Sequence, residues 1–290
     1  MNITRRRFID LSTKAAAFTS VAGSIAATAY SKAVEPSKAA STNLTSGSKK
    51  KGLGFGVRNP LWPGILTTLR CKWCYTWMGP VPSDLPEGVD FIPMIRSRNA
   101  NTEQIGEVAQ QAKAHGITEL LALNEPDAEK QDGMTVEDAL AAWPLLMETG
   151  MRIGSPACVH PDNDWMMEFM AGVEERKLRV DFICVHSYGN PNPQAYLTRL
   201  GKINKLYDRP LWITEFGVGD WQAKSVEDNK HSAEDVLRYM EKVLPMLDNL
   251  DCLERYAWFP ARPDSIPLAT SALFDAEGAL TPLGECYRDA

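Results

Sequence analysis

Short apolar runs rich in β-forming residues alternate with longer helical patterns from Gly52 to the end of the chain. Eight of the short runs have the length and composition of buried strands: Gly52 to Val57, Trp73 to Trp77, Phe91 to Ile95, Glu119 to Leu123, Arg152 to Pro156, Val180 to His186, Leu211 to Glu215 and Arg255 to Phe259. Helical periodicity fills residues 102–115, 135–149, 163–176, 194–207 and 232–249, with shorter helices before Cys71 and near the C-terminus. In the first of these helices, we expect Thr102 to be the cap and Gly116 to end the helix.

This alternation predicts a single-domain α/β fold, the (β/α)8 TIM barrel. The eight βα repeats occupy about 240 residues, close to the roughly 250 that are typical of this barrel. The main alternative is an open doubly wound sheet, which usually has a Gly-rich phosphate-binding turn after its first strand. Here the glycines of Gly52-Leu53-Gly54-Phe55-Gly56 lie within the strand, so we predict no nucleotide site.

The residues before Gly52 predict export rather than a folded domain. Residues 1–29 resemble a twin-arginine signal peptide: arginines precede Phe8-Ile9, an uncharged run follows from Ala15 to Ala29, and Ala27-Thr28-Ala29 offers a cleavage site. The uncharged run is shorter than the roughly 20 residues that span a bilayer, so we expect no stable membrane anchor after cleavage. Residues 30–51 have the composition of a flexible linker, and residues 52–290 form the folded domain. We therefore expect a periplasmic or secreted protein.

Charge and cysteine content narrow the function classes only slightly. A net charge of -6 and a pI near 5.4 argue against nucleic acid as a partner, because no basic stripe is available to neutralise phosphates. The chain has six cysteines, and Cys71 and Cys74 have the spacing of a redox motif or half a zinc site. No second pair of this kind exists, so we predict no metal or redox role for them. Disulfide pairing and oligomeric state stay open.

Two carboxylates stand where predicted strands run out into loops. Glu125 follows the fourth strand in Asn124-Glu125-Pro126, and Glu215 ends the seventh strand in Thr214-Glu215-Phe216. In a barrel, the C-terminal ends of the strands form the face that carries the active site. Because three βα repeats separate the two glutamates in a ring of eight, we expect them to face each other across the mouth. A carboxylate that has lost part of its hydration without an obvious partner indicates a functional role.

Side-chain alternation along the strands predicts which neighbours join the carboxylates. On the seventh strand, period two puts Glu215 on the same face as Ile213, so we expect Ile213 to fill the barrel and Trp212 to pack outward against helices. On the sixth strand, the same rule groups Phe182, Cys184, His186 and Tyr188. The histidine and the tyrosine are therefore expected at the mouth, beside the carboxylates.

Paired carboxyls among aromatic side chains favour chemistry on a sugar. Breaking an acetal bond requires a proton on the departing oxygen and either a nucleophile or an activated water at the sugar carbon, and two carboxyls supply both without a metal or other cofactor. The apolar C–H faces of a sugar ring stack on aromatic rings. Aromatic candidates for substrate binding gather at predicted strand ends or adjacent loops: Trp73, Tyr75, Trp77, Tyr188, Trp221 and Trp258.

Several motifs in the same order resemble those of glycoside hydrolase family 128, which includes fungal Asl1-like cell-wall proteins. They are Asn124-Glu125-Pro126-Asp127, Val185-His186-Ser187-Tyr188-Gly189 and Leu211-Trp212-Ile213-Thr214-Glu215-Phe216-Gly217, followed by Trp258. The resemblance implies endo-acting hydrolysis of β-1,3-glucan with retention of configuration. It also implies Glu125 as acid/base and Glu215 as nucleophile. We further expect Asn124 to bond a sugar hydroxyl, and His186 or Tyr188 to orient a carboxylate.

Three other readings stay open. A metal-dependent hydrolase would use His160, Asp162, Asp164 and His186 as ligands, although Asp162 or Asn163 could instead cap the helix that starts near Trp165. A β-1,4-glucanase or mannanase of the same clan would share the two glutamates and differ in its loops. A non-catalytic β-glucan-binding protein would use the aromatic cleft without cutting the chain.

Overall fold

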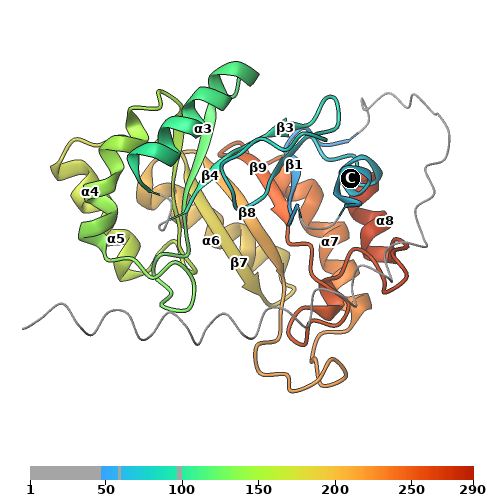
Figure 1. The fold of residues 1–290 in the computed structure, drawn as a ribbon. Helices are drawn as coiled ribbons and strands as arrows, with labels where there is room; N and C mark the ends of the chain where they lie inside the picture. The colour runs from blue at the N-terminus through green and yellow to red at the C-terminus, as the bar shows by residue number, and fades with distance from the viewer. Residues whose placement is uncertain (1–46, 58–59, 97–99) are drawn as a thin grey trace, which may run out of the picture.

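The computed structural model describes residues 47–57, 60–96 and 100–290 of the chain, in which strands and helices alternate (Figure 1). Its strands are β1 (Lys51–Gly54), β2 (Trp73–Tyr75), β3 (Asp90–Phe91), β4 (Met94–Ile95), β5 (Glu119–Asn124), β6 (Arg152–Ala157), β7 (Ile183–Gly189), β8 (Leu211–Val218) and β9 (Leu253–Trp258). Its helices are α2 (Trp62–Thr68), α3 (Thr102–His115), α4 (Val136–Met147), α5 (Asp164–Glu175), α6 (Pro193–Tyr207), α7 (Ala233–Asp248), α8 (Pro282–Asp289) and the short η2 (Ala269–Ser271). The predicted signal peptide and most of the predicted linker lie outside the described residues.

The strands are parallel and follow one another in ring order. One sheet has the order β3-β2-β1-β9-β8-β7 and the other the order β4-β5-β6. The first break between the sheets divides the predicted third strand at Ile92-Pro93, because proline has no N–H to donate to the ladder. Across the second break, Gly154 bridges Phe182, and the N–H of Ser155 donates to the Phe182 carbonyl at 2.8 Å. The architecture confirms the predicted barrel fold.

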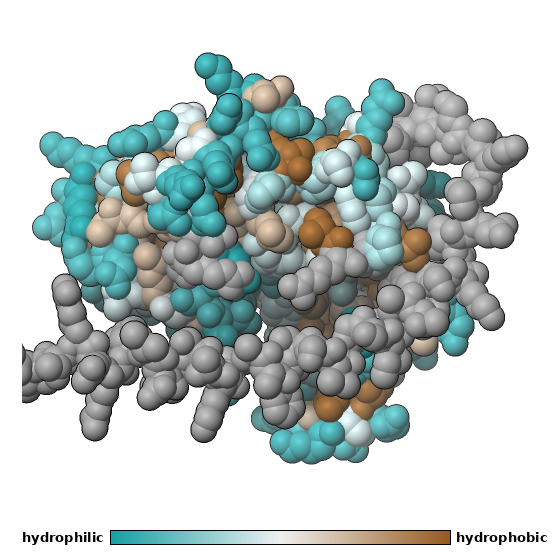
Figure 2. Space-filling view, in the orientation of Figure 1, coloured by the Kyte–Doolittle hydropathy of each residue, from teal (hydrophilic) through white to brown (hydrophobic). Residues whose placement is uncertain are grey.

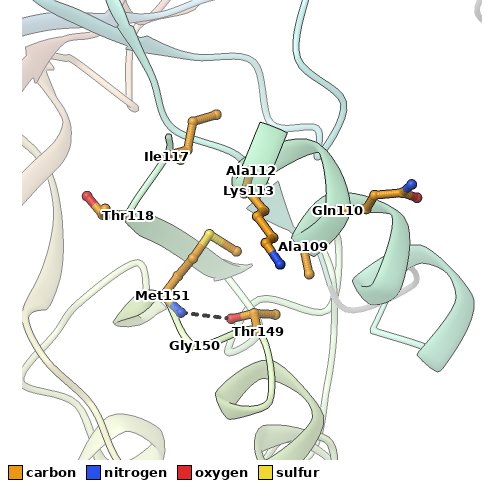
Figure 3. Close-up of a pocket in the computed structure, with 9 residues that line it drawn as sticks. All are labelled: Ala109, Gln110, Ala112, Lys113, Ile117, Thr118, Thr149, Gly150 and Met151. Carbon is orange, nitrogen blue, oxygen red and sulfur yellow. Dashed lines mark hydrogen bonds between the residues drawn. The ribbon is translucent and has the colours of Figure 1, made fainter. Parts of the chain in front are cut away.

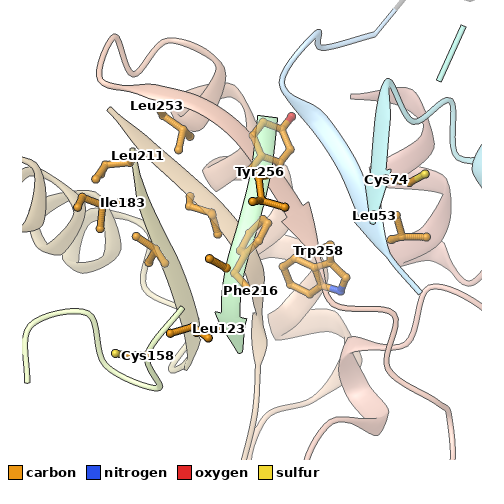
Figure 4. Close-up of a cluster of buried hydrophobic side chains, with 14 of the residues drawn as sticks. Leu53, Cys74, Leu123, Cys158, Ile183, Leu211, Phe216, Leu253, Tyr256 and Trp258 are labelled. Carbon is orange, nitrogen blue, oxygen red and sulfur yellow. The ribbon is translucent and has the colours of Figure 1, made fainter. Parts of the chain in front are cut away.

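The buried apolar residues form two clusters, one inside the barrel and one in the layer between the strands and the helices. The inner cluster consists of Trp73, Tyr75, Ile92, Met94, Leu121, Ala157, Phe182, Cys184, Trp212 and Ala257. The outer cluster includes Leu53, Leu123, Ile183, Leu211, Phe216, Tyr256 and Trp258, which Figure 4 shows packed together. Membership of one cluster or the other therefore reveals the direction in which each strand residue points.

Glycines leave room for the large rings inside the barrel. A Cβ at Gly52 would lie 2.3 Å from the Trp73 ring, and one at Gly154 would lie 2.5 Å from the Phe182 ring. Small residues opposite large ones fill a narrow barrel without overlap. Gly52, in the glycine run at the start of the domain, therefore serves packing.

The predicted direction of the side chains on β8 is wrong in its first half. Trp212 points inward, with its ring 4.2 Å from that of Phe182, whereas Ile213 packs in the outer cluster. The pairing with β7 then skips Thr214, since Val185 pairs with Ile213 and His186 with Glu215. Such a bulge reverses the alternation of the residues that follow it. Glu215 therefore reaches the mouth although Ile213 does not lie on its face.

Helix ends agree with their local sequence, with one correction. The cap of α3 is Asn101, whose side chain accepts from the N–H of Gln104 at 3.0 Å, and not the predicted Thr102. Gly116 ends the helix as predicted, with a left-handed φ of 67°. Asn163 caps α5 by accepting from the N–H of Met166.

The folded part begins slightly before the predicted boundary at Gly52. Lys51 opens β1 and has no exposed surface, and its ammonium group donates to the carbonyls of Tyr287, Arg288 and Ala290. Lys50 donates to the carbonyls of Leu247 and Leu250. Each lysine thus binds the C-terminal end of a helix, where carbonyl oxygens lack intrahelical partners. The predicted linker is therefore too long at its C-terminal end.

Replacing Lys51 with methionine is expected to destabilise the fold by about 1–3 kcal/mol at pH 7, since three carbonyls lose a charged donor. Burial lowers the pKa of Lys51 to about 8. Between pH 8 and 10.5 the unfolded chain keeps a proton that the folded chain has lost, so stability from this group rises with pH. In denaturant melts, the free energy of unfolding of the intact protein should therefore increase relative to that of Lys51→Met between pH 8 and 10.5. Lys49→Met, at an exposed position, is the control and should leave stability unchanged. If Lys51→Met is as stable as the intact protein at pH 7, the prediction is wrong.

Within the described ranges, no helix is long and apolar enough to cross a bilayer. On the face in Figure 2, hydrophobic residues are scattered among hydrophilic ones rather than gathered in one patch.

Candidate active site

Glu125 sits directly after β5 on a strained turn. Its φ of 44° and that of Leu123, 56°, are left-handed conformations that such residues rarely adopt, and they follow register shifts along β5. The N–H of Glu125 donates to the Ala157 carbonyl at 2.8 Å. Asp127 holds the same loop against the next one by accepting from the N–H of Val159 at 3.0 Å. Strain of this kind is concentrated at functional sites and requires such fixed surroundings.

Glu215 lies on β8 and its carboxylate accepts three side-chain hydrogen bonds. The indole N–H of Trp77 donates to Oε1 at 2.8 Å, and the hydroxyl of Tyr75 donates to the same oxygen at 3.2 Å. The hydroxyl of Tyr188 donates to Oε2. Burial and the Glu215 charge raise the pKa of both tyrosines well above its usual value, so both remain neutral donors. The carboxylate is thereby held in one orientation.

His186 joins the two glutamates. Its Nδ1 lies 3.0 Å from Oε1 of Glu125 and its Nε2 lies 3.6 Å from Oε1 of Glu215, and its ring has no exposed surface. Burial by itself would lower the pKa of His186, but the charges of Glu215 and Glu125 outweigh it and raise that pKa. One ligand atom from each of the three side chains lies within 4.8 Å of the others. The two carboxylates are therefore close enough to act on one bond, as predicted.

Two of the predicted substrate-binding aromatic residues lie beside this centre and expose part of their rings to solvent. Trp77 is partly exposed and bonds Glu215, as described above. Trp221, which is 63% exposed, lies edge-on to Tyr188 with ring centroids 5.9 Å apart. Its loop, drawn in orange at the bottom of Figure 1, is held by Asp220, which accepts from the N–H of Lys230. Asn124 is buried, and its Oδ1 has no hydrogen-bond partner within the described chain, so it can accept from a ligand.

Three predicted aromatics do not offer a surface to a sugar. Trp73 is buried inside the barrel, and its indole N–H donates to the Lys50 carbonyl. Trp258 is buried in the outer cluster, and its indole N–H donates to the Ser271 carbonyl (Figure 4). Tyr75 is also fully buried and contacts Glu215 instead of solvent. The substrate-binding predictions for Trp73 and Trp258 are therefore wrong, and Tyr75 orients the carboxylate.

Phe259 is the aromatic residue that sequence reasoning missed. Its ring lies 6.1 Å from that of Trp77 and 5.4 Å from that of Tyr188, and it is partly exposed. Ala257, two residues earlier, belongs to the inner cluster, so alternation along β9 brings Phe259 to the mouth and turns Trp258 outward. The alternation of side chains from Ala257 to Phe259 was the sequence signal that could have identified Phe259.

The ligands of the alternative metal site do not come together. Asp162 pairs with Arg199 at 2.9 Å, and Asn163 caps α5, whereas His186 lies with the glutamates. The cysteines are free thiols; burial raises the pKa of Cys71 to about 12, so it is no reactive thiolate. The alternative of a metal-dependent hydrolase therefore does not find its four ligands assembled.

A pocket of about 570 Å³ lies at the opposite end of the strands. It is lined by Ala109, Gln110, Ala112, Lys113, Ile117, Thr118, Thr149, Gly150 and Met151 (Figure 3). Thr118 and Met151 directly precede β5 and β6, so this pocket opens at the N-terminal ends of the strands. It contains no carboxylate and none of the candidate residues.

Comparison with known proteins identifies the family. Residues 57–287 match the family described as the glycosyl hydrolase catalytic core. The chain belongs to this family. A curated relative, alkali-sensitive linkage protein 1 of Schizosaccharomyces pombe, is 30% identical over an alignment of 227 residues, and the match covers 74% of this chain. The chain spans only 40% of that relative's length.

Solved structures of family 128 enzymes share the fold over nearly their whole length. An endo-β-1,3-glucanase from Amycolatopsis mediterranei in complex with laminaritriose is 30% identical with a TM-score of 0.70, covering 83% of this chain and 98% of its own. A curdlan-specific exo-β-1,3-glucanase from Blastomyces gilchristii in complex with glucose is 26% identical with a TM-score of 0.67, covering 85% and 100%. The resemblance to glycoside hydrolase family 128 is confirmed.

Replacing Tyr188 with phenylalanine is expected to lower kcat for glycoside hydrolysis about 10- to 100-fold, with a smaller change in KM. The variant removes one hydrogen bond to the Glu215 carboxylate, and a hydrogen bond to a carboxylate is worth about 1.5–3 kcal/mol. Steady-state kinetics checks this. Tyr207→Phe is the matched control, because that hydroxyl donates to the Pro161 carbonyl away from the glutamates. An unchanged kcat in Tyr188→Phe would show that the bond does not support catalysis.

Proposed function

We propose that this protein is a retaining glycoside hydrolase that cleaves β-1,3-glucan, with Glu125 as acid/base and Glu215 as nucleophile. The pair of nearly buried carboxylates on either side of His186 carries the proposal. Their ligand atoms lie within 4.8 Å, which suits the separation of about 5–5.5 Å in retaining enzymes better than the roughly 6.5–9.5 Å of inverting ones.

The different surroundings of the two carboxylates support the division of roles. Glu215 accepts from Trp77, Tyr75 and Tyr188, which stabilises its charge and fixes its direction for attack. Glu125 is contacted by His186 and its side chain is 13% exposed, against 8% for Glu215. The more accessible group suits proton exchange with a departing hydroxyl and with water.

Two displacements complete the proposed reaction. First, Glu215 forms a bond to the anomeric carbon while the bond to the glycosidic oxygen breaks, and Glu125 protonates that oxygen. Then Glu125 removes a proton from water as the water oxygen attacks the same carbon, and the bond to Glu215 breaks. Each displacement inverts the carbon, so the product keeps the β configuration, and one water is consumed for each bond cleaved.

The proposed substrate and mode of action rest on the structural neighbours and the mouth. The glucanase solved with laminaritriose is described as endo-acting on β-1,3-glucan. Trp77, Trp221 and Phe259 offer partly exposed rings near the carboxylates on which sugar faces can stack. We therefore propose internal cleavage, while the exo-acting neighbour makes chain-end release the alternative outcome.

Incubation with laminarin, a β-1,4-glucan and a β-mannan tests the proposal. We expect reducing sugar from laminarin alone, with mixed oligosaccharides appearing early, as internal cleavage requires. Release of glucose alone would indicate exo action. Activity on the β-1,4-linked polymers in place of laminarin would favour the clan alternative. Binding to laminarin without any cleavage would leave the non-catalytic reading.

A further inference from the structure

We propose that the candidate active site also binds a divalent transition-metal cation such as Zn²⁺, between His186, Glu215 and Glu125, and that this cation blocks the enzyme. Among the described residues, these three form the group whose metal-ligating atoms come closest together, within 4.8 Å. The reaction proposed above uses no metal, so the cation would act as an inhibitor.

The unpartnered nitrogen of His186 points to a ligand. The Nε2 atom has no hydrogen-bond partner in the described part of the chain, and its ring is fully buried. At 3.6 Å from Oε1 of Glu215, it is too far for a good hydrogen bond. A buried polar atom left without a partner costs about 1–3 kcal/mol, which a cation between Nε2 and the carboxylate would remove.

The surroundings of the three side chains resemble the outer shell of a metal site. The contact of 3.0 Å between Nδ1 of His186 and Oε1 of Glu125 fixes the orientation of the imidazole ring and leaves Nε2 as the nitrogen that can bind the cation. Glu215 is held in turn by Trp77 and Tyr188. The cation would therefore meet ligands whose directions are already set.

The donor set selects the class of cation. One imidazole nitrogen with two carboxylates suits Zn²⁺, Co²⁺, Ni²⁺ or Cu²⁺, whereas Mg²⁺ and Ca²⁺ prefer oxygen ligands alone. A bound cation would engage the lone pairs that Glu215 needs for attack and Glu125 needs for proton exchange. The inhibition rests on the proposed function, but the binding does not.

Calorimetric titration of the untagged protein with ZnCl2 at pH 7.5 tests the binding, and Co²⁺ absorption bands give a second, spectroscopic readout. We expect one cation per chain, and His186→Gln and Glu215→Gln should each weaken binding at least about tenfold. His160→Gln is the matched control and should leave affinity unchanged, because this histidine lies outside the cluster. Circular dichroism melts confirm that each variant is folded.

Three outcomes overturn the proposal. The first is that no Zn²⁺ binds below millimolar concentration. The second is that Glu215→Gln binds Zn²⁺ as tightly as the intact protein, and the third is that binding is lost in His160→Gln alone; either of these would indicate an adventitious ion only. Laminarin hydrolysis that Zn²⁺ inhibits and chelator restores would support the blocking role. Hydrolysis without Zn²⁺ binding would remove the metal site and keep the enzyme, whereas Zn²⁺ binding without hydrolysis would do the reverse.

Discussion

Replacing Glu215 with alanine is expected to lower kcat on laminarin on the order of 10⁴- to 10⁶-fold, the range seen when a catalytic nucleophile is removed. Without Glu215 no glycosyl-enzyme can form, and Trp77 and Tyr188 lose the carboxylate that they bond. Initial-rate measurement of reducing sugar checks the loss. Glu119→Ala is the control for removal of a mostly buried carboxylate outside the centre, because Glu119 pairs with Arg152 at the start of β5, and it should retain turnover.

Azide distinguishes loss of the nucleophile from loss of the fold. In Glu215→Ala, azide can occupy the space of the missing carboxylate and displace an activated leaving group once. A single displacement inverts the carbon, so the product should be an α-glucosyl azide. Residual turnover near that of the intact protein, or a β-glucosyl azide, would contradict the nucleophile assignment.

Replacing Glu125 with alanine is expected to slow hydrolysis of laminarin about 10²- to 10⁴-fold, since a general acid contributes that much. An aryl laminarioside with a good leaving group needs no proton, so its first displacement should stay fast and the glycosyl-enzyme should accumulate. A burst of phenol followed by a slow steady phase is the kinetic signature. His115→Ala, a substitution of an exposed group on α3, should leave both phases unchanged.

The configuration of the azide product also tests the role of Glu125. In Glu125→Ala, Glu215 carries out the first displacement and azide the second, so the expected product is a β-glucosyl azide. Opposite azide configurations in the two variants would therefore establish which glutamate attacks. An α-glucosyl azide from Glu125→Ala, or equal losses on laminarin and on the activated substrate, would argue against the acid/base role.

The repeating pattern of the sequence sufficed to predict the barrel and the position of both glutamates along it. It did not suffice for the direction of Trp212 and Ile213 on β8. Register shifts occur along β5 before Glu125, and the β7 pairing of β8 skips Thr214 before Glu215. A bulge reverses the face of the sheet on which the following side chains lie. It arises from hydrogen bonding between strands, so a strict alternation along one strand cannot predict it.

The aromatic predictions failed where burial was misjudged. Trp258 and Phe259 are consecutive, so one must face the helices and the other the mouth. Sequence alone favoured the tryptophan, but Ala257 faces the inside of the barrel and thereby assigns the mouth to Phe259. Trp73 fails for another reason: it fills the barrel interior opposite Gly52, where no substrate reaches it.

The N-terminal boundary shows the same limit of local reasoning. Lys50 and Lys51 belong to a lysine-rich stretch that favours a solvated linker, yet both bind carbonyls at the ends of helices some 200 residues later. These partners are distant in sequence and appear only once α7 and α8 are packed. Composition therefore placed the end of the predicted linker too late.

The central claim is double displacement at Glu125 and Glu215, and the anomer that is released first tests it most directly. Proton NMR during the first minutes of laminarihexaose hydrolysis resolves the α and β anomeric signals before mutarotation equalises them. The account predicts that the β anomer appears first and the α anomer grows in later. Initial release of the α anomer would show a single displacement and would contradict the account.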